Sequence, residues 1–404
     1  MPLRPPAGFI RPGYDPLKVP NAPTGVSATG GDASASVSFT PPANVGGSAI
    51  TQYTAVSTPG GFFAQGSASP LTVTGLTNGT AYTFAVWALN TYGPSPYSAA
   101  SGSVTPESTA TRGIFVGGTD SSNVQINVID YINIASVGNA KDFGDTTQTI
   151  RNQGACGSST RGLIAGGSPG AGGNINVIEY ITFASIGNSA DFGDLTVARQ
   201  TIGACASSTR GVFGGGTNGA GTRYNVLDYV TIASTGNATD FGDLLQTMYW
   251  VAGFGSTTRG IFGAGATSPV NTINYITIAS TGNATDFGDT TVARWSTAGF
   301  SSDTRGVFAG GEDSNGRSNV IDYITIASTG NATDFGDLTN KVSYTAGCSS
   351  TVTGVIGGGN QAIGNYTATM TYITIASTGN STSFGDLTVG RMELTSCSNC
   401  HGGL

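Results

Sequence analysis

The sequence predicts an all-β protein with two or more folded parts, and three observations lead to this fold class. Gly accounts for 63 of the 404 residues, charged residues for only 10% and hydrophobic residues for 38%. Gly-rich sequence with little charge does not hold long helices, whereas this hydrophobic share is enough to build a core. The third observation is a block that recurs six times after residue 111.

Composition also excludes several partners. The net charge of −7 leaves no basic surface to neutralise phosphates, so we expect no nucleic-acid partner. No apolar stretch of about 18 residues occurs, so we expect no membrane insertion, and the N-terminus lacks the apolar region of a signal peptide. Five Cys are few and odd in number, which argues against a disulfide framework.

Residues 1–20 form the first predicted segment. Six of them are Pro, which favours an extended arm without ladder hydrogen bonds.

Residues 21–106 are predicted to form a β-sandwich of short alternating strands. In the stretch 71–93, Tyr82, Phe84, Val86 and Ala88 fall on one face, and Asn78-Gly79 marks a turn before them. This segment resembles a fibronectin type III domain in NAPTGVSAT, SFTPP, GLTNGTAYTFAVWALN and SVTPE. The resemblance implies that Tyr82 is a tyrosine corner, whose hydroxyl bonds to the backbone upstream. The sequence departs from the family at Phe39, where Trp is usual, and another type of β-sandwich remains the alternative.

Residues 107–404 carry the six repeats, which start near 111, 160, 209, 258, 304 and 352, at a spacing of 46–49 residues. Each repeat holds a TRGVFGGG-like strand, an NVIDYITIAS-like strand and a GNATDFGD-like turn. A period of 40–50 residues with several short strands predicts a β-propeller, here with six blades of four strands. The Gly pair after the second strand, the Tyr of the third and an Arg before the next blade resemble a kelch repeat, although Phe replaces the kelch Trp.

The ends of the repeat region predict how the ring closes. The first copy begins at its second strand, and the missing first strand is present at the C-terminus as MELTSCSN (392–399). We therefore expect this strand to pair beside TRGIFVGG at 111–118, which removes an open sheet edge. Within a blade, we further expect the Arg of TRG to pair with the first Asp of the turn, for example Arg210 with Asp240.

One face of the predicted propeller varies between repeats. It carries the connections between second and third strands and those between fourth and first strands, whereas the opposite turns are nearly constant. A variable face on a constant scaffold is where binding proteins place recognition, and drift in exposed loops is the alternative. The candidate binding residues on this face are Arg223, Tyr224, Arg317, Tyr366, Arg199, Arg294 and Arg391, with Trp250 and Trp295 as weaker candidates.

Motifs that suggest cofactors have simpler explanations. CxxCH at 397–401 matches a haem-attachment pattern, but Cys397 occupies a repeat position that other copies fill with Cys or Phe, as expected of a buried apolar site. His401 is the one His, which argues against a metal centre, and Asp-Phe-Gly recurs five times, which marks a turn. We expect no cofactor, no metal and no enzymatic activity. Ca²⁺ in the Asp- and Asn-rich turns remains an open alternative.

The arm LRPPAGFIRPGYDPL, the fibronectin-like domain and the ITIASTGNATDFGD blades together resemble virion structural proteins of tailed bacteriophages, especially marine phages and cyanophages. The resemblance implies a non-enzymatic tail or fibre-type appendage on the virion exterior, whose propeller binds a host-surface glycan or receptor. It also implies that the arm anchors the chain to other virion proteins through Phe9, Ile10, Tyr14 and Leu17. The alternative is a structural or decorating protein of capsid, neck or tail without a receptor role. The position on the virion, the ligand and a homo-oligomeric state stay open.

Overall fold

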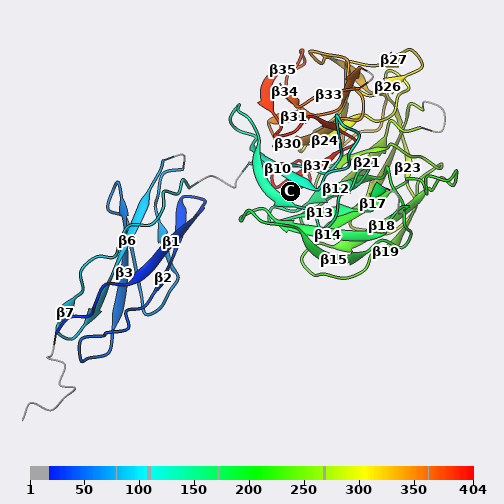
Figure 1. The fold of residues 1–404 in the computed structure, drawn as a ribbon. Helices are drawn as coiled ribbons and strands as arrows, with labels where there is room; N and C mark the ends of the chain where they lie inside the picture. Colours follow the sequence, from blue (N-terminus) through cyan, green and yellow to red (C-terminus); the bar gives the residue numbers. More distant parts are fainter. Residues whose placement is uncertain (1–17, 79, 107–110, 171–172, 267–269, 363) are drawn as a thin grey trace, which may run out of the picture. The chain divides into compact units, whose positions relative to one another are not determined.

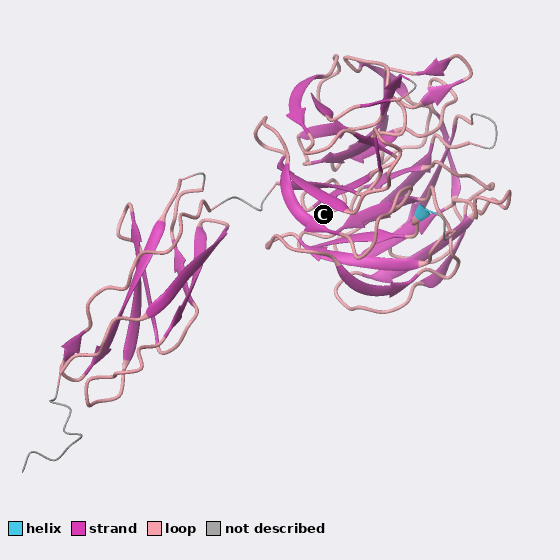
Figure 2. Cartoon of the chain, viewed as in Figure 1, coloured by secondary structure: helices cyan, strands magenta, loops and turns pink. Residues whose placement is uncertain are grey.

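The computed structural model describes residues 18–78, 80–106, 111–170, 173–266, 270–362 and 364–404. The chain divides into two compact units, Met1–Ser108 and Thr109–Leu404, and each is described by itself (Figure 1). Strands and loops make up nearly all of both units (Figure 2). The predicted all-β fold class is therefore confirmed.

The first unit is a sandwich of two antiparallel sheets. One sheet has the strand order β1 (Thr24–Gly31), β2 (Ser34–Thr40), β5 (Leu71–Thr74). The other has the order β4 (Phe63–Gly66), β3 (Gln52–Thr58), β6 (Thr83–Asn90), β7 (Gly93–Pro94).

The core of this sandwich follows the alternation seen in the sequence. Phe84, Val86 and Ala88 of β6 are buried together with Tyr82, while the residues between them are only partly covered. The Tyr82 hydroxyl accepts a hydrogen bond from the Thr77 N–H at 3.1 Å, as the tyrosine corner predicted. Phe39, at the position where Trp is usual, packs against Tyr53 with ring centroids 4.8 Å apart.

The second unit contains six four-stranded antiparallel sheets, each named by its order along the chain. Sheet 1 consists of β37 (Thr395–Ser398), β8 (Arg112–Val116), β10 (Val128–Asn133) and β11 (Lys141–Asp145). Sheet 2 consists of β12 (Gly154–Gly157), β13 (Arg161–Ala165), β14 (Val177–Thr182) and β15 (Ala190–Asp194). Sheet 3 consists of β16 (Gly203–Ala206), β17 (Arg210–Gly214), β18 (Val226–Thr231) and β19 (Thr239–Asp243).

The remaining three sheets repeat this plan. Sheet 4 consists of β20 (Ala252–Gly255), β21 (Arg259–Gly263), β22 (Thr272–Thr277) and β23 (Thr285–Asp289). Sheet 5 consists of β24 (Ala298–Ser301), β25 (Arg305–Ala309), β28 (Val320–Thr325) and β29 (Thr333–Asp337). Sheet 6 consists of β30 (Ala346–Ser349), β31 (Thr353–Gly357), β34 (Thr369–Thr374) and β35 (Thr382–Asp386).

Three small two-stranded sheets lie outside these six. They pair β9 (Thr119–Asp120) with β36 (Arg391–Met392), β26 (Glu312–Asp313) with β27 (Gly316–Arg317), and β32 (Asn360–Ala362) with β33 (Asn365–Tyr366).

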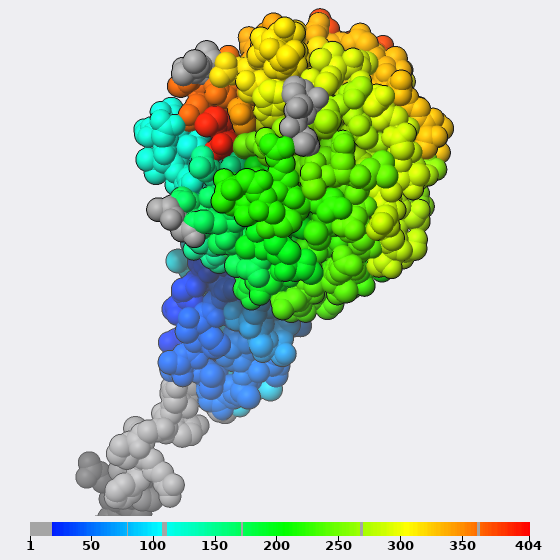
Figure 3. Space-filling view, turned by 90° about the vertical axis from the view of Figure 1, so that its right-hand side faces the viewer, coloured from blue at the N-terminus to red at the C-terminus, as the bar shows by residue number. Residues whose placement is uncertain are grey.

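The first strands of the six sheets are neighbours in sequence order. β12 contacts β16, β16 contacts β20, β20 contacts β24, β24 contacts β30, and β37 contacts both β30 and β12. Figure 3 shows the repeats following one another around the face in view, from cyan through green and yellow to orange.

The recurring Gly-Asn turn explains how each sheet docks on the one before it. In all six repeats the turn Gly donates its N–H to the carbonyl of the DFG-type Phe in the preceding sheet, as Gly187 does to Phe143 at 2.8 Å. The Phe is followed by a Gly with positive φ, and a Cβ on Gly144 would lie 2.5 Å from the Gly187 carbonyl carbon. Glycine is therefore needed where two backbones approach this closely.

The predicted Arg–Asp pairing is wrong. Arg210 lies over the ring of Tyr229 in its own sheet, 4.4 Å from the centroid, and donates from Nη1 to the Ile278 carbonyl of the next sheet at 2.8 Å. Asp240 is exposed. The same stacking and donation recur at Arg112, Arg161, Arg259 and Arg305. The aromatic ring and the carbonyl oxygen together stabilise each guanidinium, which therefore needs no carboxylate. Because the ring belongs to the same sheet as the Arg and the carbonyl to the next sheet, these Arg residues link neighbouring sheets.

The predicted pairing of the C-terminal strand is confirmed. β37 pairs antiparallel with β8 and completes sheet 1, with Cys397 opposite Ile114. These partners lie at opposite ends of the second unit in the sequence, and without β37 the strand β8 would be an open edge.

Deletion of residues 395–404 is expected to destabilise the second unit by at least about 4 kcal/mol, because it removes a buried strand and exposes an edge. Chemical unfolding and size-exclusion chromatography measure the loss and the resulting aggregation. Deletion of 401–404 alone keeps β37 and is the matched control. Equal stability of the two truncated chains would contradict the structural role of this pairing.

Candidate ligand-binding site

Six residues at equivalent places lie just before the first strands and have left-handed backbone conformations. They are Asn152, Thr201, Trp250, Ser296, Tyr344 and Glu393, with φ between 56° and 62°. A left-handed conformation costs a non-glycine residue about 1–2 kcal/mol, least for Asn. None of the six is glycine, although the chain uses glycine freely elsewhere, which points to a use for the side chains.

These six residues are linked to one another through their backbones. Five successive N–H groups donate to the carbonyl of the equivalent residue in the preceding repeat: Thr201 to Asn152 (2.7 Å), Trp250 to Thr201 (3.0 Å), Ser296 to Trp250 (3.3 Å), Glu393 to Tyr344 (3.1 Å) and Asn152 to Glu393 (2.9 Å). The linkage holds their side chains around a common space.

That space is a cavity of about 100 Å³ between the first strands, here called the central cavity. All six sheets contribute to its lining, which includes the six left-handed residues and the residue after each of them, such as Gln153 and Thr297. It opens among the segments that lead from fourth to first strands, so it lies on the face that varies between repeats.

Several polar atoms of the lining have no hydrogen-bond partner within the described protein. They are Oδ1 of Asn152, both amide atoms of Gln153, Oγ of Ser296 and Oγ1 of Thr297, and all four side chains are at least nine-tenths buried. An unsatisfied buried polar group costs about 1–3 kcal/mol. None of these atoms is exposed to the cavity. The Gln153 side chain, for instance, packs beside Gly117, where a Cβ would lie 2.6 Å from Gln153 Nε2. These polar atoms are therefore internal to the protein and lie behind the surface of the cavity.

Aromatic and charged groups complete the wall. Trp250 and Tyr344 are partly buried and pack edge to face, with ring centroids 4.8 Å apart. The Glu393 carboxylate accepts from Arg151 Nη1 at 2.9 Å and from the Thr119 hydroxyl at 3.0 Å, so its charge is balanced. Burial, followed by the Glu312 carboxylate, raises the pKa of Tyr344, whose hydroxyl stays protonated at neutral pH.

The other end of the first strands is closed by the C-terminal residues. A smaller cavity of about 40 Å³ is lined there by Cys, Ala, Phe and Ser side chains and by His401. The His401 ring bonds the Gly157 carbonyl at 2.8 Å, and burial lowers the pKa of His401. Figure 1 shows the C-terminus among the strands of the second unit. This end is apolar and plugged, so a ligand would enter from the variable face.

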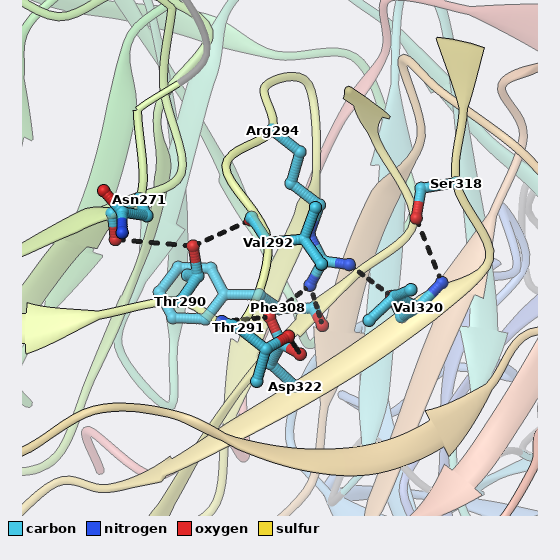
Figure 4. Close-up of polar contacts among 9 residues, drawn as sticks. All are labelled: Asn271, Thr290, Thr291, Val292, Arg294, Phe308, Ser318, Val320 and Asp322. Atoms are coloured by element: carbon cyan, nitrogen blue, oxygen red, sulfur yellow. Dashed lines mark hydrogen bonds and ion pairs between the residues drawn. The ribbon is translucent and has the colours of Figure 1, made fainter. Parts of the chain in front are cut away.

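Three of the predicted binding residues are wrong. Arg199, Arg294 and Arg391 are fully buried, and each pairs with a fully buried Asp, namely Asp228 (2.9 Å), Asp322 (2.7 Å) and Asp130 (3.0 Å). Burial raises the pKa of Asp322, with Arg294 opposing the effect. Figure 4 shows Arg294 also donating to the carbonyls of Phe308 and Val320, while Thr291 donates to Asp322. Such groups cannot reach a ligand, and they fix the connection between neighbouring sheets.

The alternation of Arg in the sequence has the same explanation. In the other three repeats the position of this Arg is occupied by Ile150, Met248 or Val342. The position of the facing Asp is then occupied by Glu179, Asn274 or Thr371, respectively. Asn274 Nδ2, for instance, faces Met248 Sδ at 3.4 Å and the Phe262 carbonyl at 3.4 Å. Both alternations are visible in the sequence and coincide, which is the signal that could have revealed the buried pairs.

The other four predicted residues lie in three different repeats, with Arg223 and Tyr224 adjacent in the connection from β17 to β18, Arg317 in β27 and Tyr366 in β33. Arg223 is exposed, with its guanidinium 4.9 Å from the centroid of the Tyr249 ring. The Tyr366 hydroxyl donates to Asn123 Oδ1 at 2.7 Å, Arg317 pairs opposite Glu312 in a hairpin, and Tyr224 is partly buried. None of these four is part of the described cavity wall, and their role in binding stays a prediction.

The two Trp candidates differ. Trp250 lines the central cavity, whereas the side chain of Trp295 hydrogen-bonds Tyr344 from outside the described lining. The anchoring candidates Phe9, Ile10, Tyr14 and Leu17 lie outside the described residues.

Most of the cavity residues were missed by sequence reasoning. Asn152, Gln153, Ser296, Tyr344 and Glu393 belong to short segments that differ in every repeat, and their left-handed conformation leaves no periodic mark. One sequence feature could have revealed these residues. The repeat position just before each first strand holds a different residue in every repeat, whereas the neighbouring strands are nearly constant.

The described residues contain neither a metal-binding cluster nor a membrane-spanning helix. No group of three or more His, Cys, Asp or Glu side chains there could hold a metal ion. Nor does that part of the chain contain a helix with the length and apolarity to cross a membrane.

Arg199→Met is expected to lower the free energy of unfolding by about 3–5 kcal/mol, because it leaves the buried Asp228 carboxylate unpaired. The double change Arg199→Met with Asp228→Asn copies the Met248 and Asn274 pair of the chain itself and should recover to within about 1 kcal/mol of the wild type. Guanidinium unfolding measures both. A single variant as stable as the wild type would contradict the buried ion pair.

The thiols are expected to be unreactive in the folded chain. Burial raises the pKa of Cys156 and of Cys400 to about 12, and it also raises those of Cys205, Cys348 and Cys397. Because the thiolate is the reactive form, a disulfide reagent at pH 8 should modify none of the five thiols before unfolding and all five after it. Rapid modification of native Cys400 would contradict the closed C-terminal end.

Comparison with known proteins identifies one part of the chain. The fibronectin type III family matches residues 21–103. No curated protein matches the chain. Residues 21–103 are therefore a fibronectin type III domain, as predicted.

Proposed function

We propose that the chain is a non-enzymatic virion protein of a tailed bacteriophage that binds the host cell surface through its second unit. In this proposal residues 1–20 anchor it to other virion proteins, the fibronectin type III domain is a spacer, and residues 107–404 form a six-bladed kelch-like β-propeller on the virion exterior. The cyclic order of first-strand contacts, the six inter-sheet hydrogen bonds of the Gly-Asn turns and the β37–β8 pairing all support the propeller.

The central cavity is the observation that carries the binding role. It lies between the first strands of all six sheets, and two aromatic side chains, Trp250 and Tyr344, line it on the face where the repeats differ. Its carboxylate, Glu393, is held by Arg151 and Thr119, and its phenol, Tyr344, has a raised pKa. The raised pKa of the Tyr344 phenol lies further from neutral pH, so this side chain favours binding over general acid–base catalysis.

The proposal predicts that purified full-length chain competes with phage for the host. Preincubating host cells with the chain should slow phage adsorption in a concentration-dependent way, because both occupy the same surface sites. The chain unfolded by heat is the control. Gold-labelled antibody against the chain should mark a distal appendage in electron micrographs of the particle.

Deletion of residues 1–20 should leave this competition intact but abolish incorporation of the chain into particles. Labelling spread regularly over the capsid, together with unchanged adsorption, would overturn the receptor role in favour of decoration.

A further inference from the structure

Five of the six junctions between neighbouring sheets hold one arginine side chain in the same way. The guanidinium carbon of Arg305, for example, lies 4.4 Å from the centroid of the Tyr323 ring, and Nη1 donates to the Ile375 carbonyl at 3.0 Å. At the five junctions the distance from this carbon to the ring centroid is 4.4–4.8 Å. The face of an aromatic ring attracts a cation, and a carbonyl oxygen accepts from its N–H groups. The ring of one sheet and the carbonyl of the next therefore form a site that fits a guanidinium, here called the guanidinium slot.

The sixth slot, between sheets 6 and 1, has no arginine in the sequence. Thr353 occupies the position that Arg305 has in sheet 5. The Tyr372 ring packs edge to face on Phe384 with centroids 6.0 Å apart, and its equivalents in the other five sheets do so at 5.9–6.1 Å. Gly138 docks on the Phe384 carbonyl at 2.8 Å, as its equivalents do at the other junctions. The sixth slot therefore keeps the geometry of the other five.

The acceptor of this slot is the Ile134 carbonyl, which is the sheet 1 equivalent of the Ile375 carbonyl. Within the part of the chain that the structure describes, no N–H or O–H group donates to this carbonyl, and no Lys or Arg side chain lies over the Tyr372 ring. Tyr372 and Thr353 are partly exposed, and Ala135, the residue after Ile134, is exposed. A side chain from another molecule can therefore reach the slot.

The other five slots show that a guanidinium suits this site better than an ammonium. Arg161 lies over the Tyr180 ring at 4.7 Å and donates from Nη1 to two successive carbonyls, Ile232 at 3.1 Å and Ala233 at 3.0 Å. The planar guanidinium stacks on a ring while its N–H groups donate, whereas the ammonium of Lys is a compact point charge. We therefore expect the ligand group to be the side chain of an arginine.

Exposed apolar side chains adjoin this slot in both sheets. Val352 precedes Thr353 and is 58% exposed, and Val137, three residues after Ile134, is 64% exposed. The other five repeats have Thr at the position of Val352, and four of them have Thr at the position of Val137. Arginine is enriched among the residues that dominate protein–protein binding, and the contacts around it exclude water. This junction thus departs from the repeat at three positions that together suit a protein ligand.

We propose that the slot between sheets 6 and 1 binds an arginine side chain of a partner protein, together with an apolar residue next to that arginine. The guanidinium stacks on the Tyr372 ring and donates to the Ile134 carbonyl, while the apolar neighbour contacts Val137 and Val352. The slot lies in the turns that follow the first strands, whereas the central cavity includes the segments before them. This surface is therefore separate from the proposed host-binding site and does not rest on it.

Saturation-transfer NMR of the full-length chain with the dipeptide acetyl-valyl-arginine amide tests the proposal. We expect a Kd in about the millimolar range, because one cation–π contact with its hydrogen bonds is weak. The same dipeptide with citrulline, a neutral group of nearly the same shape, should bind about tenfold more weakly or less. Free L-arginine, which lacks the apolar neighbour, should bind about threefold more weakly or less than the arginine dipeptide.

Substitutions copied from the other repeats locate the binding. Thr353→Arg should fill the slot, abolish binding of the arginine dipeptide and raise the unfolding temperature of the second unit by about 2 °C or more. Thr351→Arg adds the same charge at an exposed position of the same turn and should keep wild-type binding and stability. Val352→Thr should lower binding of the dipeptide to the level of free L-arginine.

Three results would overturn the proposal. Equal binding of the arginine and citrulline dipeptides would exclude a guanidinium site, and undiminished binding in Thr353→Arg would place the dipeptide elsewhere. Equal binding of free L-arginine and the arginine dipeptide would replace the partner protein by a small guanidinium compound. Thr353→Arg should still compete with phage for the host as the wild type does, so failure of this proposal leaves the proposed function standing.

Discussion

The pairing of β37 with β8 is the interaction on which the second unit depends. It joins residues 395–398 to residues 113–116, so the last strand of the chain completes the first sheet. The same segment supplies Glu393, Leu394, Thr395 and Ser396 to the wall of the central cavity. Closing the sheet edge and completing the cavity are therefore one structural event, and the cavity cannot form in a chain that lacks its C-terminus.

Between neighbouring sheets, the repeats use two different kinds of contact. Backbone hydrogen bonds from the Gly-Asn turns are present at all six junctions, whereas buried Arg–Asp pairs occupy alternate junctions. Replacing a buried ion pair by apolar residues is often neutral for stability, and the chain itself uses Met248 with Asn274 in place of one. The glycine turns thus account for docking in general, and we interpret the ion pairs as specifying which sheets adjoin.

Much of the fold could be predicted from the sequence, because alternation and repetition leave direct marks. The buried face of β6, the Tyr82 corner, the repeat strands and the C-terminal partner of β8 followed from residue patterns alone. The roles of the Arg residues could not be predicted in this way. Periodicity says where Arg210 and Arg294 recur, but not that one stacks on Tyr229 and the other meets Asp322 in the interior. The cavity residues were missed for a related reason, since they occupy a position that departs from the repeat and adopt a backbone conformation without a sequence signature.

The central claim is that the cavity between the first strands is the ligand site. A crystal structure of the full-length chain grown with a sugar fragment of the host-surface glycan tests this most directly. The central claim predicts electron density for the sugar in the central cavity, in contact with Trp250 or Tyr344. Density for the sugar on the loops that carry Arg223 or Tyr366, with only water in the cavity, would contradict it.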